Sequence, residues 1–171
     1  MTSAPRNENI TREEANARSQ SLFVDSYSVD LDLTGAGATF RSTTTCIFES
    51  QGPGTATWID LIADDVESVT LNGRELDPND VVDGARIALP DLARDNTVTI
   101  DAQCRYMNTG EGLHRFIDPV DDETYLYTQF ESADARRMYA CFEQPDLKAT
   151  FQLTVTAPDH WQVISNSPTP D

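Results

Sequence analysis

The sequence has few of the residues that build metal centres. It contains two histidines, His114 and His160, which stand 46 positions apart. A catalytic zinc ion takes three protein ligands and keeps one position open. The two histidines do not have the i, i+4 spacing of a zinc-binding helix. We therefore expect these 171 residues alone to bind no metal cofactor.

Basic residues, cysteines and long apolar runs are also scarce. Twelve Lys and Arg against 29 Asp and Glu give a net charge of −17, which argues against nucleic-acid and anionic-membrane partners. No run approaches the roughly 18 apolar residues of a membrane span, and residues 1–9 lack the apolar part of a secretory signal. Three separated cysteines, Cys46, Cys104 and Cys141, suggest buried reduced thiols and a cytoplasmic protein.

Short strands separated by turns dominate what is present. Apolar and polar residues alternate over residues 27–33, and the pair Asn72-Gly73 after residues 66–71 predicts a tight hairpin. Residues 107–119, with Gly110, Gly112 and Pro119, are expected to form a loop. The pattern predicts an all-β fold, an antiparallel curved, saddle-like sheet or β-sandwich. Further strands are expected at residues 40–48, 57–61, 86–89, 97–106, 125–131, 149–156 and 161–165.

One short helix is expected before the strands. Thr11 followed three residues later by Glu14 is the pattern of a capping box. The helix has little apolar surface, so we expect it to lie on the surface or against a part absent here. The chain then divides into an N-terminal arm, residues 1–21, and a β-sandwich domain, residues 22–171.

The strand at residues 125–131 carries unusual chemistry. Side chains on a strand alternate between faces, so Leu126, Thr128 and Phe130 are expected to face a core. Gln129 and Glu131 then point the other way at the strand's C-terminal end. An amide and a carboxylate placed together can accept hydrogen bonds from a cationic amine. Spacing alone leaves open that they are two polar residues on a solvated face.

Longer motifs around this strand resemble a known family. The segments are Tyr-Thr-Gln-Phe-Glu at 127–131, Ala-Asp-Ala-Arg-Arg at 133–137 and Cys-Phe-Glu-Gln-Pro-Asp-Leu-Lys-Ala-Thr-Phe at 141–151. They resemble the N-terminal domain of the aminopeptidase N family of zinc-dependent alanyl aminopeptidases, in wording nearest to its bacterial, actinobacterial-like branch. Residues 9–15, 27–33, 112–119 and 160–168 agree with it, so the likeness covers nearly the whole chain.

The resemblance implies a function and two site residues. Glu131 would help to hold the free α-amino group of a peptide substrate, Gln129 would line the first specificity pocket, and the bond between Glu131 and Ser132 would often be cis. The family's His-Glu-x-x-His helix and Gly-x-Met-Glu-Asn strand do not occur in this sequence. The resemblance therefore implies the substrate-anchoring domain of a zinc aminopeptidase, inactive alone, whose partners are peptide N-termini and a missing catalytic domain.

Other interpretations remain open. The chain could be a non-catalytic β-sandwich binding module, or a metal-independent hydrolase that pairs Glu131 with Glu143. The resemblance also places at least one more strand beyond residue 171, and an unpaired sheet edge predicts a dimer through that edge.

The remaining polar and aromatic residues have mainly structural interpretations. Arg136 and Arg137 are expected to pair with nearby acids, and His114 is expected to be structural. Residues 118–123 are expected to form a solvated acidic turn, because they lack the spacing of a calcium loop. Tyr125 and Tyr127 are expected either to flank a cleft or to pack in the core.

Overall fold

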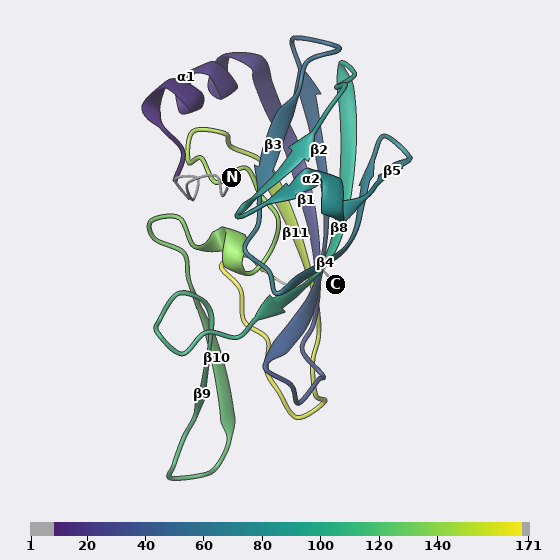
Figure 1. Ribbon diagram of the computed structural model, residues 1–171. Coiled ribbons are helices and arrows are strands. Elements are labelled where there is room, and N and C mark those ends of the chain that lie inside the picture. Colours follow the sequence, from purple (N-terminus) through teal and green to yellow (C-terminus); the bar gives the residue numbers. More distant parts are fainter. Residues whose placement is uncertain (1–8, 169–171) are drawn as a thin grey trace, which may run out of the picture.

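The computed structural model describes residues 9–168, and the all-β prediction is confirmed (Figure 1). The expectation about a secretory signal falls almost wholly on residues 1–8, which lie outside the described residues. No helix among the described residues is long and apolar enough to cross a bilayer. In chain order the elements are α1 (Arg12–Ser21), β1 (Leu22–Asp32), β2 (Thr39–Ser50), β3 (Thr57–Asp60), β4 (Asp65–Leu71), β5 (Arg74–Leu76), α2 (Pro78–Val81), β6 (Val82–Asp83), β7 (Arg86–Leu89), β8 (Asp95–Arg105), β9 (Gly112–Ile117), β10 (Thr124–Gln129), η1 (Ala135–Arg137) and β11 (Thr150–Thr156).

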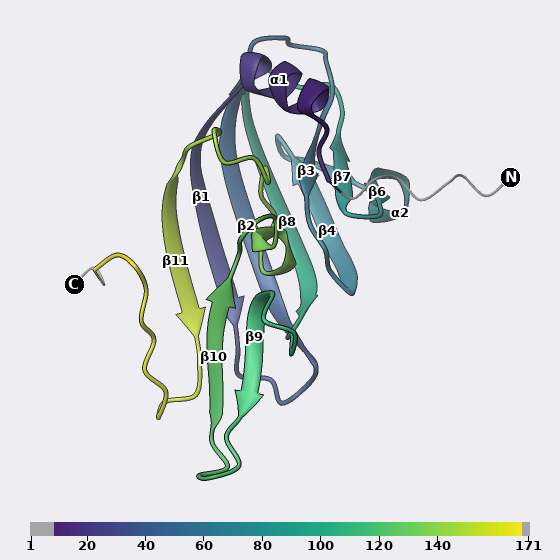
Figure 2. The same ribbon diagram turned by 90° about the vertical axis from the view of Figure 1, so that its left-hand side faces the viewer.

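Three sheets make up the fold. The largest has six strands in the order β11-β1-β2-β8-β4-β5, and its long strands curve along their length (Figure 2). A three-stranded sheet, β3-β7-β6, and the hairpin β9–β10 form the other two. All pairs are antiparallel except β1 with β11, which run parallel. In Figure 2 the hairpin and η1 lie in front of the large sheet.

The core follows the predicted alternation. In β1, Tyr27, Val29 and Leu31 are buried while the residues between them are more exposed. Because period-two burial is the mark of a strand with one covered face, the large sheet must be covered on that side. The segment after β10 covers part of it: the Phe142 amide donates to the Tyr27 hydroxyl at 3.0 Å, and the Phe142 ring meets Phe48 edge-on.

Local turn chemistry also agrees with the sequence. Asn72 and Gly73 have φ values of 54° and 79° and join β4 to β5, as the predicted hairpin requires. The capping box of α1 forms, since the Thr11 side chain accepts from the Glu14 amide and Glu14 accepts from the Thr11 amide. The division into an arm and a β-sandwich domain stays a prediction.

Two expectations about these elements were wrong. Residues 107–119 are not all loop, because β9 runs from Gly112 to Ile117 and pairs with the whole of β10. Residues 161–165 form no strand, and Val163 and Ile164 are exposed. Strands need a partner with free backbone groups as well as suitable residues, and no described strand pairs with this segment.

The helix α1 departs from expectation in a different way. Its apolar face is small, as predicted, yet Arg18 is only 2% exposed. The helix therefore attaches to the body through a buried charge instead of an apolar stripe.

Candidate functional site

The strand β10 ends at the predicted site. Phe130 is half-buried and meets the Tyr139 ring edge-on, with the ring centroids 6.0 Å apart. Gln129 before it and Glu131 after it are both exposed. Phe130 therefore holds the backbone to the core while its two polar neighbours reach solvent. Thr128, expected to face the core, is exposed.

Neither polar side chain is engaged elsewhere. Within residues 9–168, the side chains of Gln129 and Glu131 make no hydrogen bond or ion pair. Their acceptor oxygens are therefore available to a ligand. The peptide bond between Glu131 and Ser132 is cis, as the resemblance implies.

The outward face of the hairpin continues from Gln129 as a row of rings. Tyr127 lies opposite His114 in the β9–β10 register, and their rings stack with centroids 4.6 Å apart. Tyr125 lies opposite Phe116, and both are close to half exposed, at 49% and 45%. The two tyrosines therefore flank the site on an open surface, and core packing, the other expectation, is not observed.

The turn that follows Glu131 leads into η1. Arg137 pairs with Asp134, with Nε donating to Oδ1 at 2.7 Å, as expected for a local ion pair. Arg136 is buried, and its guanidinium donates to the Ala133 carbonyl at 3.0 Å and to the Asn9 side chain at 3.1 Å. Both arginines are therefore occupied by the protein itself.

Glu143 is occupied as well. Its carboxylate accepts from the Arg136 amide at 2.8 Å and from the Cys141 thiol at 3.8 Å. Burial raises the pKa of Glu143, and the Arg136 amide partly opposes that shift. Among the described residues Glu143 and Glu131 share no hydrogen bond, and the Glu143 carboxylate is held by the Arg136 amide and the Cys141 thiol.

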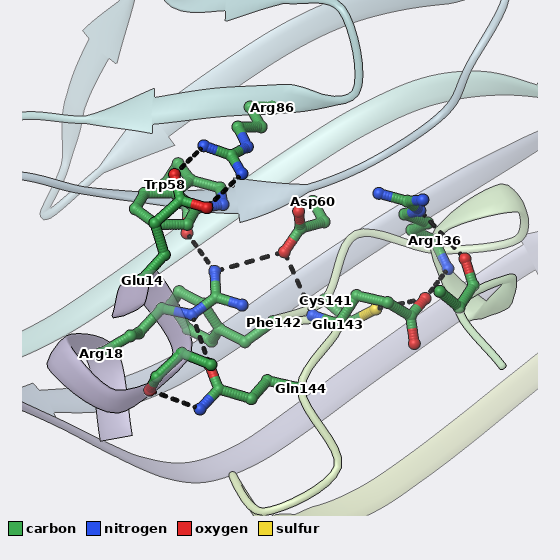
Figure 3. A network of polar contacts seen from close by, with 12 residues as sticks. Glu14, Arg18, Trp58, Asp60, Arg86, Arg136, Cys141, Phe142, Glu143 and Gln144 are labelled. Carbon is green, nitrogen blue, oxygen red and sulfur yellow. Dashed lines mark hydrogen bonds and ion pairs between the residues drawn. The ribbon is translucent and has the colours of Figure 1, made fainter. Parts of the chain in front are cut away.

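A buried polar network joins α1 to the end of this segment (Figure 3). Arg18 donates to Gln144 Oε1 at 2.9 Å, and to Asp60 Oδ2 and the Trp58 carbonyl at 3.3 Å each. The Trp58 ring lies between two guanidinium groups, 4.7 Å from Arg18 and 4.3 Å from Arg86. No local pattern in the sequence indicates this network, because its partners are far apart in the chain, as are Arg18 and Gln144, which are separated by 126 positions.

The candidate metal ligands do not come together. His114 Nδ1 accepts from the Gly110 amide at 3.0 Å, the structural role expected of it. In the acidic turn, the Asp118 side chain accepts a hydrogen bond from the Val120 amide, and the Asp121 side chain accepts one from the Glu123 amide. Over residues 9–168 no three His, Cys, Asp or Glu side chains gather as a metal site would require.

The cysteines match their expected state. Cys46, Cys104 and Cys141 are free and buried. Burial raises the pKa of Cys46 and of Cys104 to about 12, so both thiols stay protonated at neutral pH.

The comparisons with known proteins agree with the site's motifs. The chain is 60% identical over 166 residues to aminopeptidase N of Streptomyces lividans, which covers 95% of this chain and 19% of that protein. It is 56% identical over 81 residues to aminopeptidase N of Acetobacter pasteurianus, covering 43% of this chain and 21% of the relative. The chain thus spans about a fifth of the length of these two relatives.

Solved structures share the fold. Leukotriene A4 hydrolase from Saccharomyces cerevisiae superposes with a TM-score of 0.67 at 17% identity, over 82% of this chain and 24% of the other. Aminopeptidase A from Legionella pneumophila gives 0.65 at 17% identity, over 79% and 16%. The model of the peptidase M1 N-terminal domain matches residues 24–171, which hold the strand ending at Gln129, the turn at Glu131 and the sheet beneath them. This chain belongs to the peptidase M1 N-terminal domain family.

Proposed function

We propose that the chain is the substrate-anchoring domain of a zinc-dependent aminopeptidase that removes N-terminal amino acids from peptides. Glu131 holds the free α-amino group of the substrate, and Gln129 lines the pocket for its first side chain. One observation carries this proposal: both side chains are exposed and unengaged on either side of the anchored Phe130. The chain's 60% identity to an aminopeptidase N supports the peptide substrate.

The chemistry suits an exopeptidase. A carboxylate binds an ammonium group through short charge-assisted hydrogen bonds, and an acylated amine lacks the positive charge that strengthens them. The amide oxygen of Gln129 is a second acceptor. No cluster of ligands that fits a zinc ion is present among the described residues, and in this proposal residues outside them would hold the metal. There it would act as a Lewis acid toward the substrate carbonyl and activate a water.

The test is a kinetic comparison in the full-length enzyme. Glu131→Gln keeps the size of the side chain and removes its charge. We expect the KM for an alanyl chromogenic substrate to rise about 10- to 100-fold, the usual value of a hydrogen bond to a charged group. Glu123→Gln, in the exposed turn at the far end of the hairpin, is the matched control and should leave KM unchanged.

An unchanged KM in Glu131→Gln would remove the anchoring role. The chain alone, mixed with the same substrate and zinc, should give no turnover, and robust turnover would contradict the division of labour proposed here.

One observation favours the binding-module alternative. A cavity of about 510 Å³ lies between β10, β11 and residues 160–164, and several apolar side chains near it, including Leu153, Val163 and Ile164, are exposed. Exposed apolar surface of this kind often marks an interface. The coding sequence downstream distinguishes the two proposed functions, because only the aminopeptidase requires a His-Glu-x-x-His motif there.

The edge-strand dimer and the cytoplasmic location complete the proposal. β11 is the last strand of the large sheet, and open edges pair with other chains. Sedimentation of the isolated chain tests this, with a monomer at all concentrations as the contrary result.

Three free buried thiols fit a reducing compartment, and cell fractionation tests the location.

A further inference from the structure

One side chain fastens the turn of Glu131 to the hairpin. The guanidinium of Arg137 donates from Nε to Asp134 Oδ1 at 2.7 Å, inside the turn. A terminal nitrogen of the same group lies 3.5 Å from Glu111 Oε2, at the entry to β9. Arg137 therefore links the turn that follows β10 to Glu111, the residue directly before β9.

A glycine allows this close approach. Gly112 lies directly opposite Gln129 in the β9–β10 register. A Cβ atom built on Gly112 would lie 2.7 Å from Cβ of Arg137, closer than side chains tolerate, and the φ of Gly112 is +59°. Both properties require glycine. Arg137 thus packs against the backbone position that is paired with Gln129.

The turn itself is closed by backbone hydrogen bonds. The Asp134 amide donates to the Phe130 carbonyl at 3.0 Å, and the Arg137 amide donates to the Asp134 carbonyl at 3.1 Å. Glu131 lies within this closed segment. Its position relative to Gln129 is set on one side by β10 and on the other by Arg137.

We propose that Arg137 is a positioning residue for substrate binding, which fixes Glu131 relative to Gln129 by clamping the turn 131–134 against Gly112. The inference rests on the proposed function, because it needs Glu131 to bind the amine. The two ion pairs of Arg137 are partly exposed, and such pairs contribute little to overall stability. A binding group displaced by about 1 Å, in contrast, can lower activity about 100-fold.

A double-mutant cycle in the full-length enzyme tests the clamp. Arg137→Ala should raise the KM for a free-amine aminoacyl substrate about tenfold, with a smaller change in kcat and an almost unchanged thermal midpoint. In the Glu131→Gln background, the same substitution should change KM less than about twofold, because residues that act through one another are not additive. Arg137→Lys keeps the charge and should recover part of the loss.

A glycine pair gives an independent check. Gly112→Ala should raise KM as Arg137→Ala does, because the added methyl group pushes Arg137 away. Gly110 also has a positive φ, +87°, but a Cβ there meets only the Tyr127 hydroxyl at 3.8 Å. Gly110→Ala therefore carries similar backbone strain without the clash, and its KM should stay close to that of the parent.

Three results would overturn the positioning role. They are an unchanged KM in Arg137→Ala, effects of Arg137→Ala and Glu131→Gln that multiply independently, and equal KM values for the two glycine variants. If Glu131→Gln itself leaves KM unchanged, the anchoring function fails and the clamp fails with it. If Glu131→Gln has its effect but shows no coupling to Arg137→Ala, only the clamp fails.

Discussion

Two regions near opposite ends of residues 129–144 differ in whether their charged side chains are paired within the protein or exposed to solvent. At one end, Arg18 and Asp60 are almost fully buried, and Arg18 also donates to Gln144. At the other end, Gln129 and Glu131 are exposed, and their side chains make no hydrogen bond or ion pair within residues 9–168. A buried charge must be satisfied by the protein, so it serves the fold. An exposed carboxylate on well-anchored backbone is free to serve a ligand.

Removing the buried charge of Arg18 should have the largest effect on the free energy of unfolding. Arg18→Met leaves Asp60 buried without its cation, which typically costs about 3–5 kcal/mol in the free energy of unfolding. Urea denaturation measures this loss. Arg12→Met, at an exposed position of the same helix, should change stability by less than about 0.5 kcal/mol.

The double variant Arg18→Met with Asp60→Asn sharpens this prediction. It removes both charges and should be more stable than Arg18→Met alone. Equal stability of Arg18→Met and Arg12→Met would show that the network does not hold the helix.

The ion pair at the edge of the same network should give a smaller, pH-dependent effect. Glu14 accepts two hydrogen bonds from Arg86, at 2.7 and 3.0 Å, and this pairing lowers the pKa of Glu14 from 4.5 to about 2. A depressed carboxyl pKa stabilises the fold above pH 4.5, and that contribution is lost as the pH falls from 4.5 towards 2.

Glu14→Gln isolates this contribution, since glutamine can still form the capping box. Its difference in unfolding free energy from the parent should be greatest at neutral pH and shrink below pH 4.5. Glu13→Gln, at the exposed neighbouring position, is the control. A difference that is constant from pH 7 to pH 3 would contradict the assignment.

The two regions also differ in how well the sequence predicts them. The strand pattern predicted a strand at residues 125–131, and β10 ends at Gln129, so Gln129 lies at its end while Glu131 lies in the turn beyond it. The Arg18 network depends on residues brought together only by the fold. The strand β9 was missed because Gly110, Gly112 and Pro119 indicate a loop, whereas Gly112 is the first residue of a strand and opposes Gln129. The contact of Arg137 with Gly112 could not be predicted either, because Gly112 belongs to the strand that was missed.

The smallest expected effect on stability belongs to the exposed region. Glu131→Gln should leave the free energy of unfolding within about 0.5 kcal/mol of the parent, since the side chain is exposed and makes no hydrogen bond or ion pair within the described residues. A larger loss would mean that Glu131 supports the fold and would weaken the contrast between the two regions.

Ligand discrimination in the full-length enzyme tests the anchoring role most directly. Inhibition constants would be measured for a peptide analogue with a free α-amino group and for the same analogue lacking it. We predict that Glu131→Gln raises the inhibition constant of the amine-bearing ligand about 10- to 100-fold. The inhibition constant of the ligand without the amine should not change. Equal changes for both ligands, or none for either, would contradict the role of Glu131 as the amine anchor.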